Sequence, residues 1–253
     1  MEFSYPEIYS EMLKSPHILI AGSTGCGKSV TLNGLIYSAM IEGLERKDGT
    51  RFIYFDMKMV ELIDWRDIPT CVGYVDRPEN APRELNRMVD LMYKRYEVMQ
   101  SRRQKETQEG HIYIVIDELA DFIQNKGCLD PLVTIGRLGR AAHIHIIACT
   151  QDPSRGTLSA PFMQNMSCRL ALKCNSPIES RQIVGTAGAE ELPAHGTGIL
   201  NMGRTEYVEV PMVEQEDIER LIEGLGGESY RPVQKVATRT VNFNNMNLVS
   251  NWR

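Results

Sequence analysis

Residues 22–29 read Gly22-Ser23-Thr24-Gly25-Cys26-Gly27-Lys28-Ser29, and this octapeptide is the most informative part of the 253-residue chain. It fits the pattern G-x-x-x-x-G-K-[ST] and stands between the apolar run 17–21 and an amphipathic stretch that begins near Lys28. Glycines allow such a loop to curl so that its backbone N–H groups point inward, where the positive end of the following helix dipole adds to them. The sequence therefore predicts a loop that binds phosphate groups.

Anionic phosphates at this loop imply ATP and Mg²⁺ as the cofactors. We expect Lys28 to reach the β- and γ-phosphates and the Ser29 hydroxyl to ligate Mg²⁺. The alternative, a glycine-rich turn ahead of a helix, is disfavoured because the strand, the spacing, the lysine and the serine are all present. The predicted nucleotide-binding residues are Gly22, Ser23, Thr24, Gly25, Cys26, Gly27, Lys28, Ser29 and Val30.

Two acidic residues, Asp117 and Glu118, follow the apolar run 112–116. The carboxyl end of a buried parallel strand lies at the crevice where α/β proteins bind ligands, so we expect the pair beside the phosphate-binding loop. Asp117 is then expected to hold the Mg²⁺ shell through water, and Glu118 to orient and deprotonate the attacking water. Taken alone, an apolar run followed by two acids is as often the start of a helix, but its pairing with Lys28 favours a site.

Gln151 follows the apolar run 145–149, so it is expected at the same edge of the sheet as the two acids. There its amide would sense the γ-phosphate; the alternative is a turn residue before Asp152. Arg140 lies near the end of the preceding predicted helix, where the helix dipole favours a cation whatever its role. In a ring of subunits this edge would face the neighbour's ATP, and the guanidinium could stabilise the transition state.

Short apolar runs alternate with longer amphipathic stretches along the chain, which is typical of a parallel sheet covered by helices. The predicted strands occupy residues 17–21, 51–55, 71–75, 112–117, 145–149 and 169–173, with a hairpin at 198–201 and 206–210. The predicted helices occupy residues 28–43, 83–103, 130–142, 178–184 and 214–225.

The composition is that of an ordinary globular protein, with 42% hydrophobic and 24% charged residues. The longest apolar runs are far shorter than the roughly 20 residues that cross a bilayer, so no membrane span is expected. Six cysteines without a CxxC pair indicate buried thiols in a reducing compartment. The net charge of −5 gives no global signature of nucleic-acid binding, so any contact with DNA must come from a local patch.

The assembled motifs resemble the motor domain of the FtsK/SpoIIIE family of DNA translocases over about residues 16–213. Six segments carry the resemblance: PHILIAG at 16–22, RFIYFDMKMVEL at 51–62, DELAD at 117–121, GRAAHIH at 139–145, TQDPS at 150–154 and ESRQI at 179–183. The resemblance implies an α/β, RecA-like P-loop NTPase with a mostly parallel central sheet and helices on both faces. We accordingly divide the chain into an N-terminal extension (1–15), an ATPase motor domain (16–228) and a flexible basic C-terminal tail (229–253).

The same resemblance implies that ATP hydrolysis drives double-stranded DNA through the pore of a homo-oligomeric ring, expected to be a hexamer. It places Arg140 at the family's trans-acting arginine position and makes Lys58 and Arg181 candidate neighbours of the site. Three positions depart from the family pattern without removing a catalytic group: Cys26, Met57 and Asp152.

The chain shows neither a membrane-spanning region nor a winged-helix module. We therefore expect a minimal translocase of a conjugative element, a plasmid or a phage, recruited to the membrane by a partner. A membrane-bound protein or a relaxase is the candidate partner.

DNA contact is expected from loops that line the ring pore, and Arg155 is the candidate because it follows Gln151 and could meet a phosphate. A second basic stretch consists of Lys94, Arg95, Arg102, Arg103 and Lys105. A solvated helix face is the favoured interpretation of that stretch.

Two other functions remain open from the sequence. Secretion ATPases share the core of this family, so the chain could be the motor domain of a protein-export machine. A regulatory or scaffold subunit that does not hydrolyse ATP is disfavoured by the presence of Lys28, Asp117 and Glu118.

Overall fold

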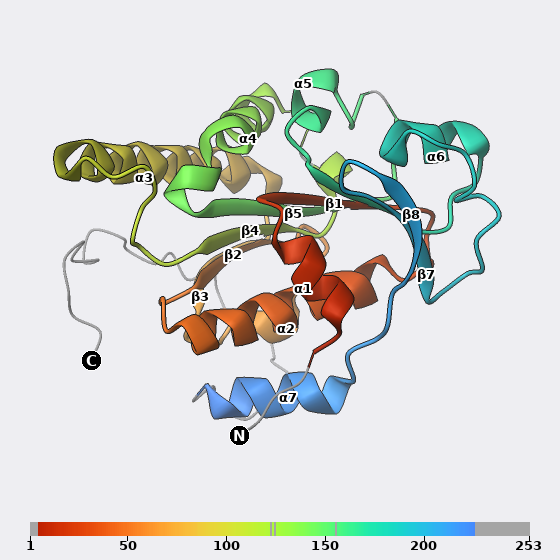
Figure 1. Ribbon diagram of the computed structural model, residues 1–253, viewed down its shortest axis with the longest axis horizontal. Coiled ribbons are helices and arrows are strands. Elements are labelled where there is room, and N and C mark those ends of the chain that lie inside the picture. Colours follow the sequence, from red (N-terminus) through yellow and green to blue (C-terminus); the bar gives the residue numbers. More distant parts are fainter. Residues whose placement is uncertain (1–4, 122, 124, 155, 226–253) are drawn as a thin grey trace.

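The computed structural model describes residues 5–121, 123, 125–154 and 156–225, and these form one eight-stranded sheet between two layers of helices (Figure 1). The strand order is β3-β2-β4-β5-β1-β6-β7-β8, in which the strands from β3 to β6 pair in parallel and β7 and β8 pair antiparallel. The strands are β1 (His17–Ala21), β2 (Arg51–Phe55), β3 (Cys71–Val75), β4 (Ile112–Ile116), β5 (Ile144–Thr150), β6 (Cys168–Ala171), β7 (Thr197–Asn201) and β8 (Thr205–Glu209).

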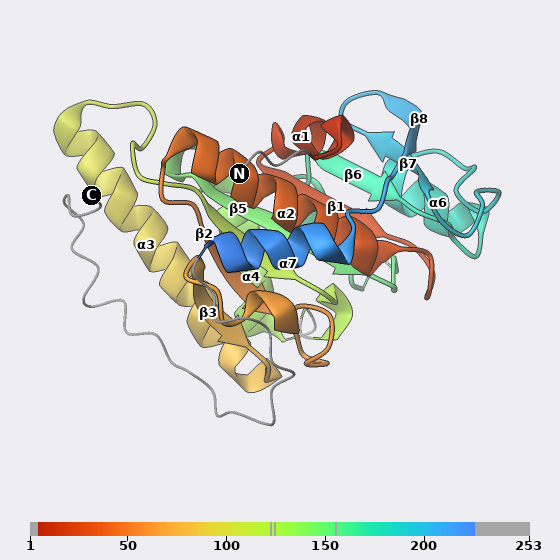
Figure 2. The ribbon, with the colours of Figure 1, turned by 90° about the horizontal axis from the view of Figure 1, so that it is seen from below.

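Helices cover both faces of the sheet because alternate residues of the central strands point to opposite sides. On β1, Leu19 packs into one hydrophobic core, whereas Ile18 and Ile20 pack into the other. One face carries α3 (Ala81–Arg102), α4 (Lys126–Leu138), α5 (Ala160–Met163) and α6 (Pro177–Val184). The other carries α1 (Glu7–Leu13), α2 (Lys28–Arg46) and α7 (Gln215–Gly224), as Figure 2 shows from below.

This architecture confirms the predicted fold class. All eight predicted strands form within two residues of their predicted limits. A strand buried on both faces needs a run of apolar residues with no polar alternation, and β1 and β4 are buried at every position. Among the described residues, no helix combines the length and hydropathy that crossing a bilayer requires.

One predicted helix is shifted along the chain, and two short helices, α1 and α5, form where none was predicted. The helix predicted at 130–142 begins at Lys126, because the Asn125 side chain accepts a hydrogen bond from Gly127 N at 2.9 Å and caps a turn that precedes Pro131. It ends at Leu138, and residues 140–142 form a separate 3₁₀ turn, η4 (Arg140–Ala142). Helix α1 was not predicted from the sequence.

Helix α1 lies within the segment expected to be an N-terminal extension, and it packs on α2. Tyr9 and Met12 are fully buried, and the Tyr9 hydroxyl donates a hydrogen bond of 2.5 Å to Pro211 O. A bulky ring lies directly against the α2 backbone because Gly34 has no side chain; a Cβ there would lie 2.4 Å from the ring. Seven residues cannot form a stable helix alone, so this packing holds α1 in place.

A histidine cluster occupies the amino-terminal ends of β1, β4 and β5, and we define it as His17, His111, His143 and His145. His111 stacks on His143 with ring centroids 4.2 Å apart, and its Nδ1 lies 2.7 Å from His145 Nε2. Burial lowers the pKa of His17 and of His111 to about 4 and lowers the pKa of His145 well below its usual value. These three rings are therefore neutral at pH 7 and resist protonation in the folded state.

We predict that the free energy of unfolding falls as the pH drops from 6.5 to 4. In that range the unfolded chain takes up protons that the buried rings do not bind, so acid favours unfolding. His17 and His111, whose pKa falls from 6.5 to about 4, each contribute on the order of 3 kcal/mol. His111 faces Asp48, Arg46 and Arg95 as well as the other rings, and burial is the largest cause of its depressed pKa. Urea unfolding at pH 7 and pH 5 measures the effect.

His111→Phe keeps a flat ring in the stack but cannot titrate, so the difference between the two pH values should shrink. Its baseline stability at pH 7 should also fall by about 1 kcal/mol, because the bond to His145 is lost. Tyr113→Phe is the control, since this ring also stacks on His111 and its pKa of about 12 lies outside the range. An unchanged pH dependence in His111→Phe would contradict the explanation.

Candidate nucleotide site

The glycine-rich loop joins β1 to α2 at the carboxyl edge of the sheet. Gly25 and Gly27 have φ angles of 72° and 98°, which the left-handed region allows to glycine at little cost. The loop is fixed to the two strands beside β1, because Gly22 N donates to Thr150 O at 3.3 Å and Ser23 N donates to Lys173 O at 2.8 Å. The sheet therefore sets the position of the loop.

The Lys28 side chain is buried and turns back under the loop. Its ammonium donates hydrogen bonds to Gly22 O at 3.0 Å and Ser23 O at 2.6 Å. Only 8% of the residue is exposed. The two backbone carbonyls beneath the loop therefore solvate the charge in place of water. A cation in this place attracts an anionic group to the loop.

Gly22 lies where the loop passes closest to β6. A Cβ at this position would lie 2.8 Å from Cys26 Sγ and 3.0 Å from Lys173 O. The Cys26 thiol, which is 3% exposed, fills the same space, and burial raises its pKa. Cys26 is thus a packing residue under the loop, and any side chain at position 22 would displace it.

Glu118 follows β4 by two residues, and its carboxylate is held by the end of the neighbouring strand β5. Oε1 accepts a bond of 2.8 Å from the Thr150 hydroxyl, and Oε2 accepts a bond of 3.0 Å from Gln151 N. Ala120 N donates to Oε1 at 3.2 Å. Glu118 is 6% exposed, so these bonds fix a nearly buried carboxylate in one orientation.

Gln151 lies between the acidic pair and the loop because β5 separates β4 from β1 in the sheet. Its side-chain Oε1 accepts a hydrogen bond of 2.7 Å from the Thr24 hydroxyl at the exposed tip of the loop. Its backbone N–H simultaneously contacts Glu118. One residue thus connects the phosphate-binding loop with the candidate base.

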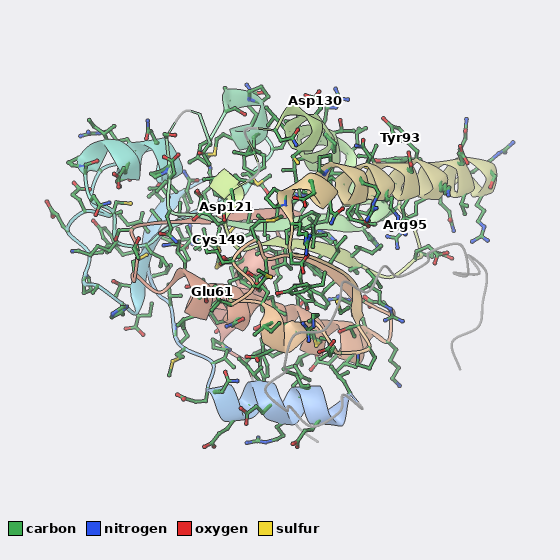
Figure 3. The ribbon with its side chains drawn as sticks, turned by 180° about the vertical axis from the view of Figure 1, so that it is seen from behind. Glu61, Tyr93, Arg95, Asp121, Asp130 and Cys149 are labelled. Atoms are coloured by element: carbon green, nitrogen blue, oxygen red, sulfur yellow. The ribbon has the colours of Figure 1, made fainter. Side chains whose placement is uncertain are left out.

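The carboxylates around Asp117 carry more negative charge than nearby cations balance. The pKa of Asp117 is raised to about 7, chiefly by burial and also by the neighbouring charges of Asp56 and Glu61, whereas Lys58 lowers it. Asp56 is fully buried, and its Oδ1 has no hydrogen-bond partner among the described residues. Figure 3 labels Glu61 on the loop after β2.

Mg²⁺ prefers carboxylate and hydroxyl oxygens, so a cation bound at Asp117 would offset this charge. Among the described residues, no three His, Cys, Asp or Glu side chains come together as a metal site by themselves. Ser29, in the first turn of α2, supplies the hydroxyl that the sequence predicted.

Arg140 does not lie in this site. It precedes β5, whereas Gln151 follows the same strand, and the seven residues of β5 span about 23 Å at the usual rise of a strand. Its side chain is exposed at the opposite edge of the sheet. Arg181 is exposed on α6, and Arg155 falls outside the described residues.

The second basic stretch is only partly a surface feature. Lys94, Arg102, Arg103 and Lys105 are exposed, but Arg95 is 7% exposed and donates to Ala142 O at 2.6 Å. Helix periodicity explains the difference, because Arg95 shares the sheet-facing side of α3 with Met92 and Met99. Arg95 is therefore unavailable for DNA, and the solvated face favoured from the sequence holds for the other four residues but not for Arg95.

A hollow of about 420 Å³ opens beside the loop, and sequence patterns gave no sign of most of its lining. Val30 belongs to the predicted nucleotide-binding set, but His195 and Met212 come from connections far along the chain with no motif of their own. The His195 side chain comes within 4.0 Å of the position that a Cβ on Gly27 would take. The size and position of this hollow suit the nucleoside part of a bound nucleotide.

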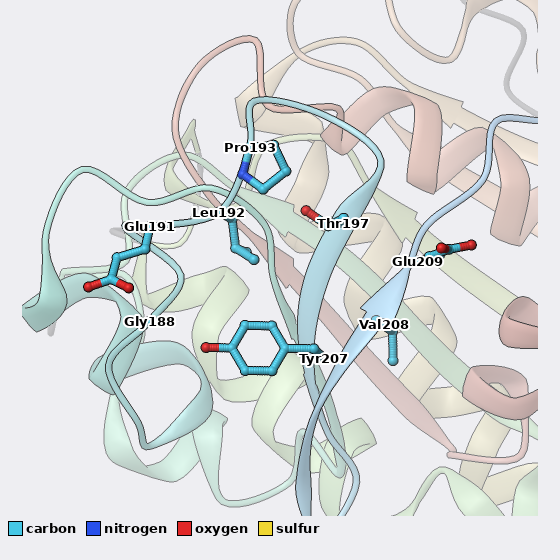
Figure 4. A pocket seen from close by; sticks show the side chains of 8 residues that line it. All are labelled: Gly188, Glu191, Leu192, Pro193, Thr197, Tyr207, Val208 and Glu209. Atoms are coloured by element: carbon cyan, nitrogen blue, oxygen red, sulfur yellow. The ribbon is translucent and has the colours of Figure 1, made fainter.

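A second pocket, of about 450 Å³, lies across the β7–β8 hairpin (Figure 4). Thr197 and Glu209 line both pockets, so the two are neighbours. Figure 4 shows the Tyr207 ring extending beneath the segment that carries Gly188. No residue predicted from the sequence lies in this second pocket.

The model of the FtsK/SpoIIIE family matches residues 2–114 of the chain. A DNA translocase FtsK of Streptococcus pyogenes is 32% identical over 236 residues, which cover 83% of this chain and 29% of that protein. A DNA translocase FtsK of Lactococcus lactis is 36% identical over 208 residues, covering 74% of this chain and 27% of that protein. The chain thus spans less than a third of the length of these relatives.

Solved structures of P-loop ATPases share the fold. The pCW3 conjugation coupling protein TcpA, solved in a monomer form with ATPγS, matches with a TM-score of 0.72 at 21% identity, over 82% of this chain and 65% of that chain. EssC of Geobacillus thermodenitrificans, ATPases 2 and 3, matches with a TM-score of 0.73 at 18% identity, over 84% of this chain and 44% of that chain.

We predict that Gly22→Ala weakens ATP binding at least tenfold, because the new methyl group must displace Cys26 or the end of β6 and so distort the loop. Overpacking of this kind also costs about 1–3 kcal/mol of stability. Calorimetric titration with a non-hydrolysable ATP analogue measures the affinity.

Gly198→Ala is the matched control. Its Cβ would lie 2.6 Å from Leu170 Cδ1, so it also crowds β6, but from β7 and away from the loop. This variant should lose comparable stability and keep the parent affinity. Equal losses of affinity in both variants would show that general destabilisation, and not the loop, is responsible.

Proposed function

Because the chain belongs to the FtsK/SpoIIIE family, we propose that it is the ATPase motor of a double-stranded DNA translocase. The observation that carries the proposal is the linkage of Lys28, Glu118 and Gln151 at one edge of the sheet. Strand order and hydrogen bonds hold these three groups around the point where the γ-phosphate of ATP would lie.

Each group has a distinct task in phosphoryl transfer to water. Lys28 exchanges its carbonyl partners for the β- and γ-phosphates, and the loop N–H groups take the remaining phosphate oxygens. Glu118, oriented by Thr150, accepts a proton from the attacking water. Gln151 contacts both the loop and Glu118, so the amide can report the loss of the γ-phosphate to β5.

Ser29 and Asp117 are the residues that would hold Mg²⁺, which supplies charge neutralisation at the phosphates when bound. Burial among other acids raises the pKa of Asp117 to about 7, so a bound cation would stabilise the charged form of this carboxylate. The hollow beside Val30 and His195 receives the nucleoside.

The site is completed by a second copy of the chain. Arg140 is exposed at the amino-terminal end of β5, away from the Lys28 and Glu118 of its own chain, so we assign it to a neighbour's nucleotide. A closed ring in which each subunit offers Arg140 to the next satisfies this geometry, and a hexamer is the ring we propose. Mixing Arg140→Ala with Glu118→Gln subunits tests it, because only an arginine that acts across the subunit boundary restores turnover.

The polymer that we propose the ring moves is double-stranded DNA; the relatives from Streptococcus pyogenes and Lactococcus lactis are DNA translocases. The conjugation coupling protein among the structural neighbours supports a role in DNA transfer by a conjugative element, plasmid or phage. The proposed place of action is the bacterial cytoplasm, with a membrane-bound protein or a relaxase as partner. Arg155 remains the proposed DNA contact.

The alternative is a protein-secretion motor, favoured by the likeness to EssC. Duplex DNA separates the two functions. For the translocase, ATP turnover should rise several-fold with duplex DNA, and the stimulation should weaken between 50 and 200 mM salt, because bound phosphates release counterions. Absence of stimulation by duplex DNA at low salt would exclude the translocase and leave the secretion motor.

We also predict that Thr150→Val lowers the rate of ATP turnover about tenfold without changing ATP affinity. The substitution keeps the shape of a fully buried side chain but removes the hydroxyl that orients Glu118. Thr157→Val is the control, because this threonine is equally buried and its hydroxyl bonds to Asp152 instead. Turnover near the parent rate in Thr150→Val would show that the bond does not matter to the reaction.

A further inference from the structure

The turn that carries Arg140 is held from below by helix α3. Arg140 begins the 3₁₀ turn η4, which joins α4 to β5 and ends at His143 in the left-handed conformation, with φ of 51°. The Arg140 side chain is exposed, but the backbone around it is anchored. A guanidinium that acts on a neighbouring molecule needs such an anchored base, since its own side chain is long and flexible.

Every backbone carbonyl from Leu138 to His143 accepts a hydrogen bond. Four of these six carbonyls accept from backbone N–H groups of the turn itself or of the strands and loop beside it. The other two carbonyls are reached by side chains of α3. The Tyr96 hydroxyl donates to Leu138 O at 2.6 Å, and Arg95 Nη1 donates to Ala142 O at 2.6 Å. The two α3 side chains thus hold the turn on both sides of Arg140.

Burying the charged Arg95 side chain costs free energy, although it donates a hydrogen bond to the Ala142 carbonyl. It is 7% exposed, and burial lowers its pKa to about 10, so it still carries a charge at pH 7. Its Nε has no hydrogen-bond partner among the described residues, and its Nη1 makes only a second, longer contact, of 3.4 Å, to His143 O. Figure 3 shows Arg95 on the sheet side of α3 and Tyr93 on the outer side. A buried, incompletely paired charge costs stability, so this one is better explained by positioning than by stability.

Gly139, at the base of the turn, shows how tightly this segment is packed. A Cβ there would lie 2.3 Å from Ile144 O and 2.6 Å from Ile135 O. The backbone at Gly139 therefore lies directly against Ile135 and Ile144, with no room for a side chain between them. On the side of α3, the hydrogen bonds from Arg95 and Tyr96 hold the turn.

We propose that Arg95 and Tyr96 are positioning residues that fix the direction in which Arg140 is presented to the nucleotide of a second copy of this chain. The inference rests on the proposed trans role of Arg140. The two side chains do not touch the nucleotide; they act through the η4 backbone.

Tyr96→Phe and Arg95→Met test this inference in the full chain. Tyr96→Phe loses one oxygen atom and keeps its ring, so the fold persists, and Arg95→Met keeps a long apolar side chain. We expect ATP turnover to fall about tenfold in Tyr96→Phe and on the order of a hundredfold in Arg95→Met, with unchanged ATP affinity, because a misplaced catalytic group loses rate and not substrate. Tyr93→Phe and Lys94→Met, exposed on the same helix, are the matched controls and should keep the parent rate.

Mixing with Glu118→Gln separates positioning from general damage. Glu118→Gln subunits have a blocked site but an intact Arg140 turn. In a mixed ring they supply a well-placed arginine to the intact site of an Arg95→Met or Tyr96→Phe neighbour. Turnover should therefore recover on mixing, to the same extent as in a parallel mixture with Arg140→Ala. A merely structural defect in α3 would not be repaired by a neighbour's arginine.

The inference is overturned if both variants keep the parent turnover, or if they lose turnover that mixing does not restore although Arg140→Ala is restored. If Arg140→Ala itself keeps turnover or is not restored, the trans role fails, and the positioning role fails with it. Arg140→Ala thus shows which of the two proposals is wrong.

Discussion

The hydrogen bonds that Thr150 and Gln151 donate to the Glu118 carboxylate are the interaction on which the site depends. They join the end of β5 to the end of β4, and the Thr24–Gln151 bond extends the connection to the loop after β1. A parallel sheet brings these ends to one edge, but it does not orient a carboxylate. The Thr150 hydroxyl and the Gln151 N–H, at the end of β5, orient the Glu118 carboxylate. The strand β5, between β4 and β1, therefore contributes directly to the site.

The second constraint is electrostatic. Lys28 is buried against carbonyls, while Asp117 and Asp56 are buried with too little positive charge around them. Burying these charges without a ligand costs free energy. A bound polyphosphate would offset the charge of Lys28, and Mg²⁺ would offset the charge of the two acids. Ligand binding at this end of the sheet should therefore order the loops that carry these groups. This charge compensation is a physical reason why the conformation of the loops would depend on the bound nucleotide.

The strands and the loop could be predicted from the sequence because they depend on local signals. Apolar runs such as 112–116 have to be buried on both faces, and the glycine pattern of 22–29 needs left-handed backbone angles at Gly25 and Gly27. Features that depend on distant contacts could not be predicted. Helix α1 is held by Tyr9 against Gly34 and Pro211, and His195 reaches the loop from a connection with no motif. Arg95 belongs to a basic stretch by sequence, and only its place on the α3 face makes it internal.

The most direct test of the proposed hydrolysis site is a single-turnover measurement on Glu118→Gln. This variant exchanges one carboxylate oxygen for an amide group and leaves the loop and Lys28 untouched. We predict ATP binding at the parent affinity with hydrolysis slowed at least a hundredfold, so that ATP stays trapped on the protein. Hydrolysis at the parent rate would contradict the assignment of Glu118 and, with it, the site described above.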